Sequence, residues 1–485
     1  MATTPDFTAR TLARNASLLL ALWLGFWLLA LGLVLGLLWI PFVQIHYKST
    51  FDLAGIIATA AALTLAWSLR PRSDEKDKNR PVPLARNEAE KLYEMIERIG
   101  HKIGIDAPVD IHLVGAATAF IYGHRNWMGR IKRLQVGLGL PMLGTLSEAE
   151  LGSVIAHEFG HFVAGDLSLG PWVYRTRTSI AHTVHDLDDS IFFFDILFRW
   201  YGQWFLRLSR RVSRQQELAA DAQAARHFGI PATRAALEKI HLIDPMWSSY
   251  LDHEVFPALN RGVRPPIFAG FRLFCLPGTK RPEVQAAITR AEHQPTDDYD
   301  SHPSLEDRVA ALVPGAKPAW PALTNCFDLL GGETAAENLW LTSIKASQLP
   351  ACEWENYGSG TLQPQIEQRF AKTWMDPEQL PLTELPQLAS TLDQLWVRLK
   401  PDGVSLLSPQ GKRNHVQAIL EEWIVACLCH AGFTPRPHPG LPLKLEQNGT
   451  TLQPAQLLRD AIDGKLDSAQ LRQMLGSAKV SLAKA

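Results

Sequence analysis

The stretch SEAELGSVIAHEFGH, residues 147–161, decides the fold that we expect for this 485-residue chain. If it is helical, His157 and His161 lie one turn apart on the same face, so that their imidazoles can share one zinc ion. Glu158 then lies beside the metal, where its carboxylate can take a proton from a bound water that attacks a peptide carbonyl. The stretch therefore predicts a helix that carries two metal ligands and a general base.

The start and the packing of this helix can also be predicted. Ser147 and Glu150 match the S-x-x-E pattern of a capping box, which places the first turn directly after Ser147. Four apolar residues recur at helical spacing and give the helix a surface to bury: Leu151, Val154, Ile155 and Phe159. We expect a buried and well-defined helix, as a metal scaffold requires.

A catalytic zinc needs a third protein ligand, and the candidate lies in the segment SRQQELAADAQAARHF, residues 213–228. The segment predicts a helix that is closed by Gly229. Glu217 and Asp221 are four residues apart and share one face, so that Glu217 can bind the metal while Asp221 accepts a hydrogen bond from a ligand histidine. Carboxylates on helices are usually solvated, but the neighbouring Leu and Ala residues favour a buried site.

The composition restricts the partners and the compartment. A net charge of −1 and a pI near 7 give no sign of a nucleic-acid partner. The five cysteines are an odd number without a CxxC pair, which favours a reducing compartment. We expect Cys427 and Cys429, two apart in the run WIVACLC, to act as small buried apolar residues.

The hydrophobic residues concentrate in the first seventy positions and predict two transmembrane helices, 16–40 and 53–69. Most of the flanking Lys and Arg residues precede the first helix or follow the second, so the positive-inside rule places both outer flanks in the cytoplasm. We therefore expect an integral protein of a bacterial inner membrane whose catalytic domain faces the cytoplasm. Gly32 and Gly36 form a GxxxG pair that either packs on another helix, allowing an oligomer, or is coincidental.

After a charged, proline-rich linker (71–86), one amphipathic helix and three strands are predicted. The strands are 109–114, 117–123 and 131–139, separated by glycine-bearing turns. A small sheet beside the metal helix can offer an edge strand to an extended substrate, and 117–123 is our candidate. Most short strands merely cover a core, which is the alternative.

Three separated motifs carry a resemblance: HEFGH, then ELAAD, then SHPSLEDR at 301–308. Together they resemble peptidase family M48, a family of gluzincin metalloendopeptidases that includes HtpX-like membrane proteases. The resemblance implies an α+β, mainly helical fold with a small sheet, and one zinc ion bound by His157, His161 and Glu217. It implies these further roles: Glu158 as general base, Asp221 beside the ligands, His302 as oxyanion stabiliser, Arg308 as structural support, and Ala117, Thr118, Ala119 and Phe120 as the substrate-binding strand.

The chain departs from the family pattern in two places. Thr118 stands where members usually have Asn, which can alter how substrate is held. HtpX-like members have two further membrane helices between the motifs, whereas the long apolar run here, 191–208, contains Asp195, Arg199 and Arg207. Because such charges are costly at a bilayer centre, we expect an interfacial or groove-lining helix in preference to a span. Asp166 also matches a family position, or is only a helix cap.

The sequence thus predicts four parts: a membrane anchor (1–70), the linker, a peptidase domain (87–316) and a C-terminal accessory domain (317–485) of unknown role, which can select substrate, shield the site or mediate assembly. The expected function is a membrane-anchored zinc endopeptidase with polypeptide substrates and the lipid bilayer as partners. A prenyl-protein protease of the same family would normally need a larger membrane chamber. A catalytically silent scaffold would be expected to lose Glu158 or a ligand first, and all are present.

Overall fold

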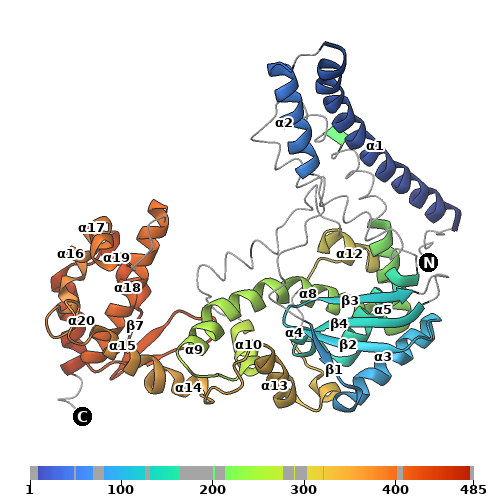
Figure 1. The fold of residues 1–485 in the computed structure, drawn as a ribbon. Helices are drawn as coiled ribbons and strands as arrows, with labels where there is room; N and C mark the ends of the chain where they lie inside the picture. The colour runs from blue at the N-terminus through green and yellow to red at the C-terminus, as the bar shows by residue number, and fades with distance from the viewer. Residues whose placement is uncertain are drawn as a thin grey trace. The chain divides into compact units, whose positions relative to one another are not determined.

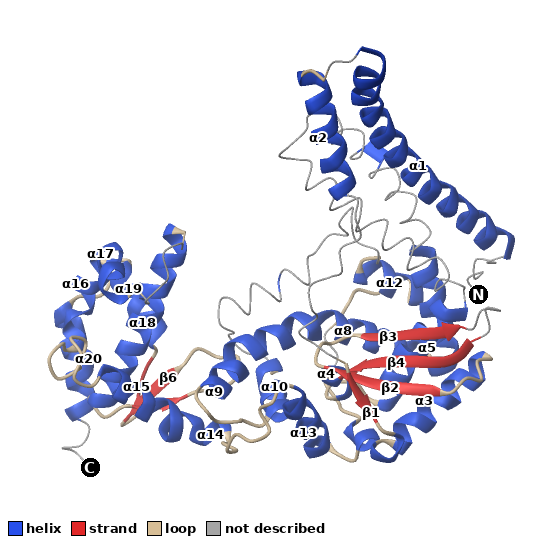
Figure 2. Cartoon of the chain, viewed as in Figure 1, coloured by secondary structure: helices blue, strands red, loops and turns tan. Residues whose placement is uncertain are grey.

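The computed structural model describes residues 9–48, 51–68, 81–125, 131–163, 200–201, 214–276, 289, 303–319, 322–400 and 408–480. Over these residues the chain is mainly helical with small sheets, as predicted (Figure 2). Contacts divide it into two compact units, Met1–Ile243 with Glu292–Gly332, and Asp244–Ala291 with Glu333–Ala485. The predicted domain boundaries stay predictions.

Two apolar helices begin the described chain: α1 (Ala9–Lys48) and α2 (Leu53–Ser68), drawn in blue in Figure 1. Within α1 the stretch Leu20–Tyr47 has a mean hydropathy of 2.4 and is long enough to cross a membrane. The 16 residues of α2 make a helix about 24 Å long, shorter than a bilayer core of about 30 Å. Among the described helices, α1 alone therefore meets the length and hydropathy expected of a membrane span.

The predicted apolar run 191–208 lies outside the described residues except for Trp200 and Tyr201. The Tyr201 hydroxyl donates a hydrogen bond to the carbonyl of Leu22 at 2.5 Å, and its ring lies 6.1 Å from that of Phe26. This part of the run thus lies against α1.

A four-stranded sheet has the order β1-β2-β4-β3, so that β3 is an edge strand (Figure 1). Its strands are β1 (Val82–Leu84), β2 (Val109–Val114), β3 (Ala119–Arg125) and β4 (Ile131–Gly139). β2 pairs in parallel with β4, and both outer strands pair antiparallel. The bounds of β2 and β4 are those predicted, and β3 begins two residues later.

The strand β1 was not predicted, because it lies in the segment assigned to the linker. Its Pro83 lacks a backbone N–H, but β1 is at the sheet edge, where such a residue is tolerated. The register pairs Phe120 with Gly137, and a side chain at Gly137 would collide with the Phe120 ring. The glycine therefore leaves room for the Phe120 ring over β4.

Helices complete this unit: α3 (Glu90–Ile103), α4 (Leu140–Leu143), α5 (Glu148–Val163), residues 214–228, the first part of α8 (Ile230–Tyr250), and α12 (Leu305–Leu312). The predicted capping box is present at the start of α5, since Glu150 accepts from the Ser147 N–H at 2.7 Å and its own N–H donates to the Ser147 hydroxyl at 3.3 Å. Leu151, Ile155 and Phe159 are buried as predicted.

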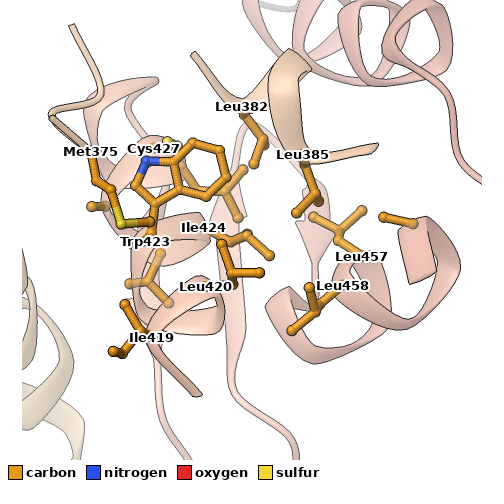
Figure 3. Packing of buried hydrophobic residues seen from close by; sticks show 14 of the residues in the cluster. Met375, Leu382, Leu385, Ile419, Leu420, Trp423, Ile424, Cys427, Leu457 and Leu458 are labelled. Atoms are coloured by element: carbon orange, nitrogen blue, oxygen red, sulfur yellow. The ribbon is translucent and has the colours of Figure 1, made fainter. Parts of the chain in front are cut away.

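The second unit contains α9 (Phe256–Asn260), α10 (Ile267–Cys275), α13 (Glu333–Ser343), α14 (Trp354–Tyr357), α15 (Gln363–Phe370), α16 (Leu385–Ser390), α17 (Leu392–Leu399), α18 (Pro409–His430), α19 (Pro454–Ile462), α20 (Ser468–Val480) and strands β5 (Thr434–Arg436), β6 (Lys444–Gln447) and β7 (Thr450–Leu452). Trp423 of α18 lies beside Met375, in a hydrophobic cluster that also contains residues of α16 and α19 (Figure 3). Cys427 and Cys429 are buried there as predicted, and burial raises the pKa of Cys429 to about 12.

The predicted Asn448–Gly449 turn joins β6 to β7, and both of its residues have positive φ.

Candidate metal and catalytic site

Two helices bring the predicted metal ligands together. α5 carries His157, Glu158 and His161, and the helix over residues 214–228 carries Glu217. The two helices approach each other closely at Gly160, where the glycine has no side chain. A Cβ added there would lie only 3.2 Å from the Cα and Cβ of Ala220. The small residues within the two motifs thus set the distance between the helices that hold the ligands.

The three ligand groups have the spacing of a tetrahedral zinc site. The Nε2 atoms of His157 and His161 are 3.0 Å apart, and each lies 3.4 Å from an oxygen of Glu217. Zinc–nitrogen and zinc–oxygen bonds of about 2.0–2.2 Å place neighbouring tetrahedral ligands about 3.4 Å apart. The donor set therefore fits one zinc ion.

Asp221 and Arg308 form hydrogen-bonding contacts that support the three ligand groups. Asp221 Oδ1 lies 2.9 Å from His157 Nδ1, which assigns the ring proton to Nδ1 and makes Nε2 the nitrogen that could bind a metal. Arg308, on α12, donates through Nε and a terminal nitrogen to the two Asp221 oxygens at 2.8 and 2.7 Å. Asp221 is 1% exposed, so this two-point contact is shielded from water.

The charges of the site follow from these contacts. Burial would raise the pKa of Asp221, but the hydrogen bonds from Arg308 and His157 outweigh it and lower that pKa. Burial would likewise lower the pKa of His157, and its contacts with Asp221 and Glu217 raise it instead. Asp221 is therefore held as a carboxylate, which keeps the His157 ring oriented.

A cavity of about 500 Å³ opens at the metal group. His157, Glu158 and His161 line it from α5, and Arg308 lines it from α12. From the predicted substrate strand, Ala117, Thr118 and Ala119 line it. Phe120 does not, because its ring packs over Gly137. His302 and Asp166 lie outside the described residues, although Pro303 and Ser304 next to His302 line the same cavity.

Sequence reasoning missed the contribution of α8. Lys239, 1% exposed, donates from Nζ to Glu150 Oε2 at 2.7 Å, and the Ser153 hydroxyl donates to Thr233 Oγ1 at 2.8 Å. Both contacts join α8 to the metal helix. Ser153 lies four residues before His157, so it shares the face of the ligand, and this spacing was the available signal.

The comparisons with known proteins agree with this geometry. The model of peptidase family M48 matches residues 86–314. Two curated proteins named "Protease HtpX homolog 1" match over 81 residues, 16% of this chain: that of Sulfurisphaera tokodaii is 33% identical and that of Saccharolobus solfataricus 36%. The chain spans about a quarter of the length of these relatives, 24% in both. No solved structure matches the chain.

Proposed function

Since residues 86–314 belong to peptidase family M48, we propose that this protein is a membrane-anchored, zinc-dependent endopeptidase that hydrolyses peptide bonds of membrane or membrane-proximal proteins. The observation that carries the proposal is the spacing of His157, His161 and Glu217. Their ligand atoms all lie within 4.8 Å of one another, at the edge of the cavity that Glu158 also lines. Three protein ligands would leave one position of a tetrahedral zinc for water or substrate, as a catalytic zinc requires.

Each residue has a chemical role in this proposal. When bound, zinc would lower the pKa of a water to about 7 and polarise the substrate carbonyl. Glu158 accepts the proton of the attacking water and returns it to the leaving amine. Asp221 and Arg308 keep His157 in the tautomer that binds metal. His302 is proposed from the family resemblance alone to stabilise the oxyanion of the tetrahedral intermediate.

Membrane anchoring is proposed from α1 and from the distribution of charge. The 28-residue apolar stretch of α1 supports a span, and α2 returns the chain through a turn that Asp52 caps, accepting from the N–H groups of Ala54 and Gly55 at 3.0 and 3.3 Å. The Lys and Arg residues that flank the two helices favour a cytoplasmic catalytic domain at a bacterial inner membrane. Such a placement would bring membrane-proximal polypeptides to the site.

A cleavage assay tests the proposal. The detergent-solubilised full chain is loaded with zinc and incubated with an unfolded protein such as reduced casein, beside Glu158→Gln and the control Glu148→Gln, which makes the same change on an exposed residue of α5. Loss of the base should slow cleavage by about 10²–10⁴-fold, and the control should cleave at the parental rate. Equal activity of parent and Glu158→Gln at equal zinc content would refute the role of Glu158. A zinc-loaded parent that cleaves nothing would favour the alternative that the protein is a catalytically silent membrane scaffold.

A further inference from the structure

One face of α8 forms a wall of the cavity beside the metal group. Five residues of the helix line it, at positions that recur every three or four residues: Thr233, Ala236, Leu237, Ile240 and His241. This spacing places them on one side of the helix. None of them belongs to a motif of the metal site, so α8 adds a separate surface to the cavity.

The wall is held at a fixed position relative to the catalytic residues. The buried pair Ser153–Thr233 joins α8 to the metal helix one turn before His157, and the pair Glu150–Lys239 joins it one turn earlier still. The cavity-lining positions Ala236 and Leu237 lie between these two tie points. A substrate side chain that meets the wall therefore meets it at a defined distance from the reacting centre.

The middle of the wall is apolar, and Thr233 and His241 lie at its two ends. Ala236, Leu237 and Ile240 form its middle, and Val154 and Met142 line the same cavity. The Asp, Glu and Arg residues among the described lining residues are those of the metal group and its supports: Glu158, Glu217, Asp221 and Arg308. Away from that group, the cavity offers the apolar side chains of Ala236, Leu237 and Ile240, with the uncharged polar residues Thr233 and Ser153 and the imidazole of His241 around them.

We propose that this face of α8 binds the substrate side chain next to the scissile bond and selects an aliphatic residue at that position. The inference rests on the proposed peptidase function. Leu237 is half-buried and directed to the cavity, so it contacts the bound side chain and determines which size and charge are accepted. Discrimination at such a surface typically amounts to about 10–200-fold per methylene group in kcat/KM.

The test is a cleavage-site profile of the zinc-loaded full chain on a peptide library, read by mass spectrometry. The parent should show enrichment of Leu, Ile, Val or Met at one position beside the cut. Leu237→Arg should shift the preference at that same position to Asp or Glu, with the ratio of acidic to aliphatic cleavage rising at least about tenfold. Ala235→Arg is the matched control, because Ala235 is half-buried on the same helix and does not line the cavity.

The outcomes separate this inference from the proposed function. An active, zinc-loaded Leu237→Arg protein with the parental profile would overturn the role of α8, as would a parent without preference beside the cut. If Leu237→Arg fails to fold, Ile240→Ala takes its place. At the same position beside the cut, this variant should cleave peptides with Phe more often, relative to peptides with Val, than the parent does. An unchanged Phe-to-Val ratio would then overturn the inference. A parent that cleaves no peptide at full zinc content contradicts the peptidase function itself.

Discussion

Replacing Lys239 by Met should strongly destabilise the first compact unit, which contains the candidate metal site, because it breaks a buried ion pair. The Lys239 side chain is 1% exposed and that of Glu150 is 11% exposed, and their charged atoms are 2.7 Å apart. Removing one partner of such a pair typically costs about 3–5 kcal/mol, since the remaining charge stays buried without compensation. Met retains most of the aliphatic volume of Lys, so that the loss is mainly electrostatic.

The remaining contacts of Glu150 set the magnitude within that range. Its Oε2 still accepts from the Ser147 N–H at 2.7 Å and from the Thr324 hydroxyl at 3.4 Å after the lysine is removed. We therefore expect the lower end, about 3 kcal/mol. For a domain of this size that corresponds to a fall in Tm of about 6–12 °C.

Thermal and urea unfolding of the full chain, in a double-mutant cycle with Glu150→Gln, measures this cost. Each single variant should lose about 3 kcal/mol or more, and the double variant should lose less than the sum because no charge is left unpaired. Arg86→Ala is the control, since Arg86 and Glu97 form a pair whose side chains are 55% and 36% exposed, and it should cost much less than either buried variant. Additive single effects, or a Lys239→Met loss below about 1 kcal/mol, would refute the reasoning.

Three further predictions concern the site and its surroundings. Gly160→Ala should weaken zinc binding about tenfold by calorimetry although alanine favours helices, because the new Cβ would lie 3.2 Å from Ala220 and force the ligand helices apart. Arg308→Lys should weaken zinc binding about 10–100-fold, since lysine cannot reproduce the two-point contact with Asp221. Burial raises the pKa of Cys326 to about 12, so its thiol stays protonated from pH 7 to 9 and alkylation in the native protein should not accelerate over that range.

The outcomes that contradict these predictions are specific. Arg413 makes the same two-point contact with Asp393, at 2.9 and 2.7 Å, but on the surface of the other unit. Arg413→Lys should leave zinc affinity unchanged, and an equal loss in both lysine variants would point to a nonspecific effect. Unchanged affinity in Gly160→Ala would show that the helices do not need this contact. Rapid native alkylation of Cys326, at the rate of an unfolded control, would contradict its burial.

Much of the fold could be predicted because local sequence patterns agreed with it. The alternating residues of 109–114 and the run 131–139 gave the bounds of β2 and β4, and the capping box placed the start of α5. In contrast, β1 was missed because its three residues follow a charged, proline-rich segment and gain their structure from pairing with β2. Such a short strand is stabilised by its partner and leaves little signal of its own.

The site could be predicted in part for a similar reason. The spacing within HEFGH and ELAAD places side chains on single helix faces, and the family resemblance paired the two motifs. The structure brings His157, His161 and Glu217 together accordingly, with their ligand atoms within 4.8 Å of one another. Contacts between distant segments left no such pattern. The Ser153–Thr233 hydrogen bond joins residues 80 positions apart, and the orientation of Phe120 away from the cavity depends on Gly137 of the neighbouring strand. Periodicity does not encode these pairings.

The metal content of two purified full-length proteins tests the central claim most directly. The parent and Glu217→Ala are equilibrated with equal zinc, passed over a desalting column and measured by atomic emission. The parent should retain one zinc ion per chain, and Glu217→Ala should retain much less than one while keeping its helical circular dichroism. One zinc ion per chain in a folded Glu217→Ala protein would contradict the assignment of Glu217 as the third ligand, and a zinc-free parent would contradict the metal site itself.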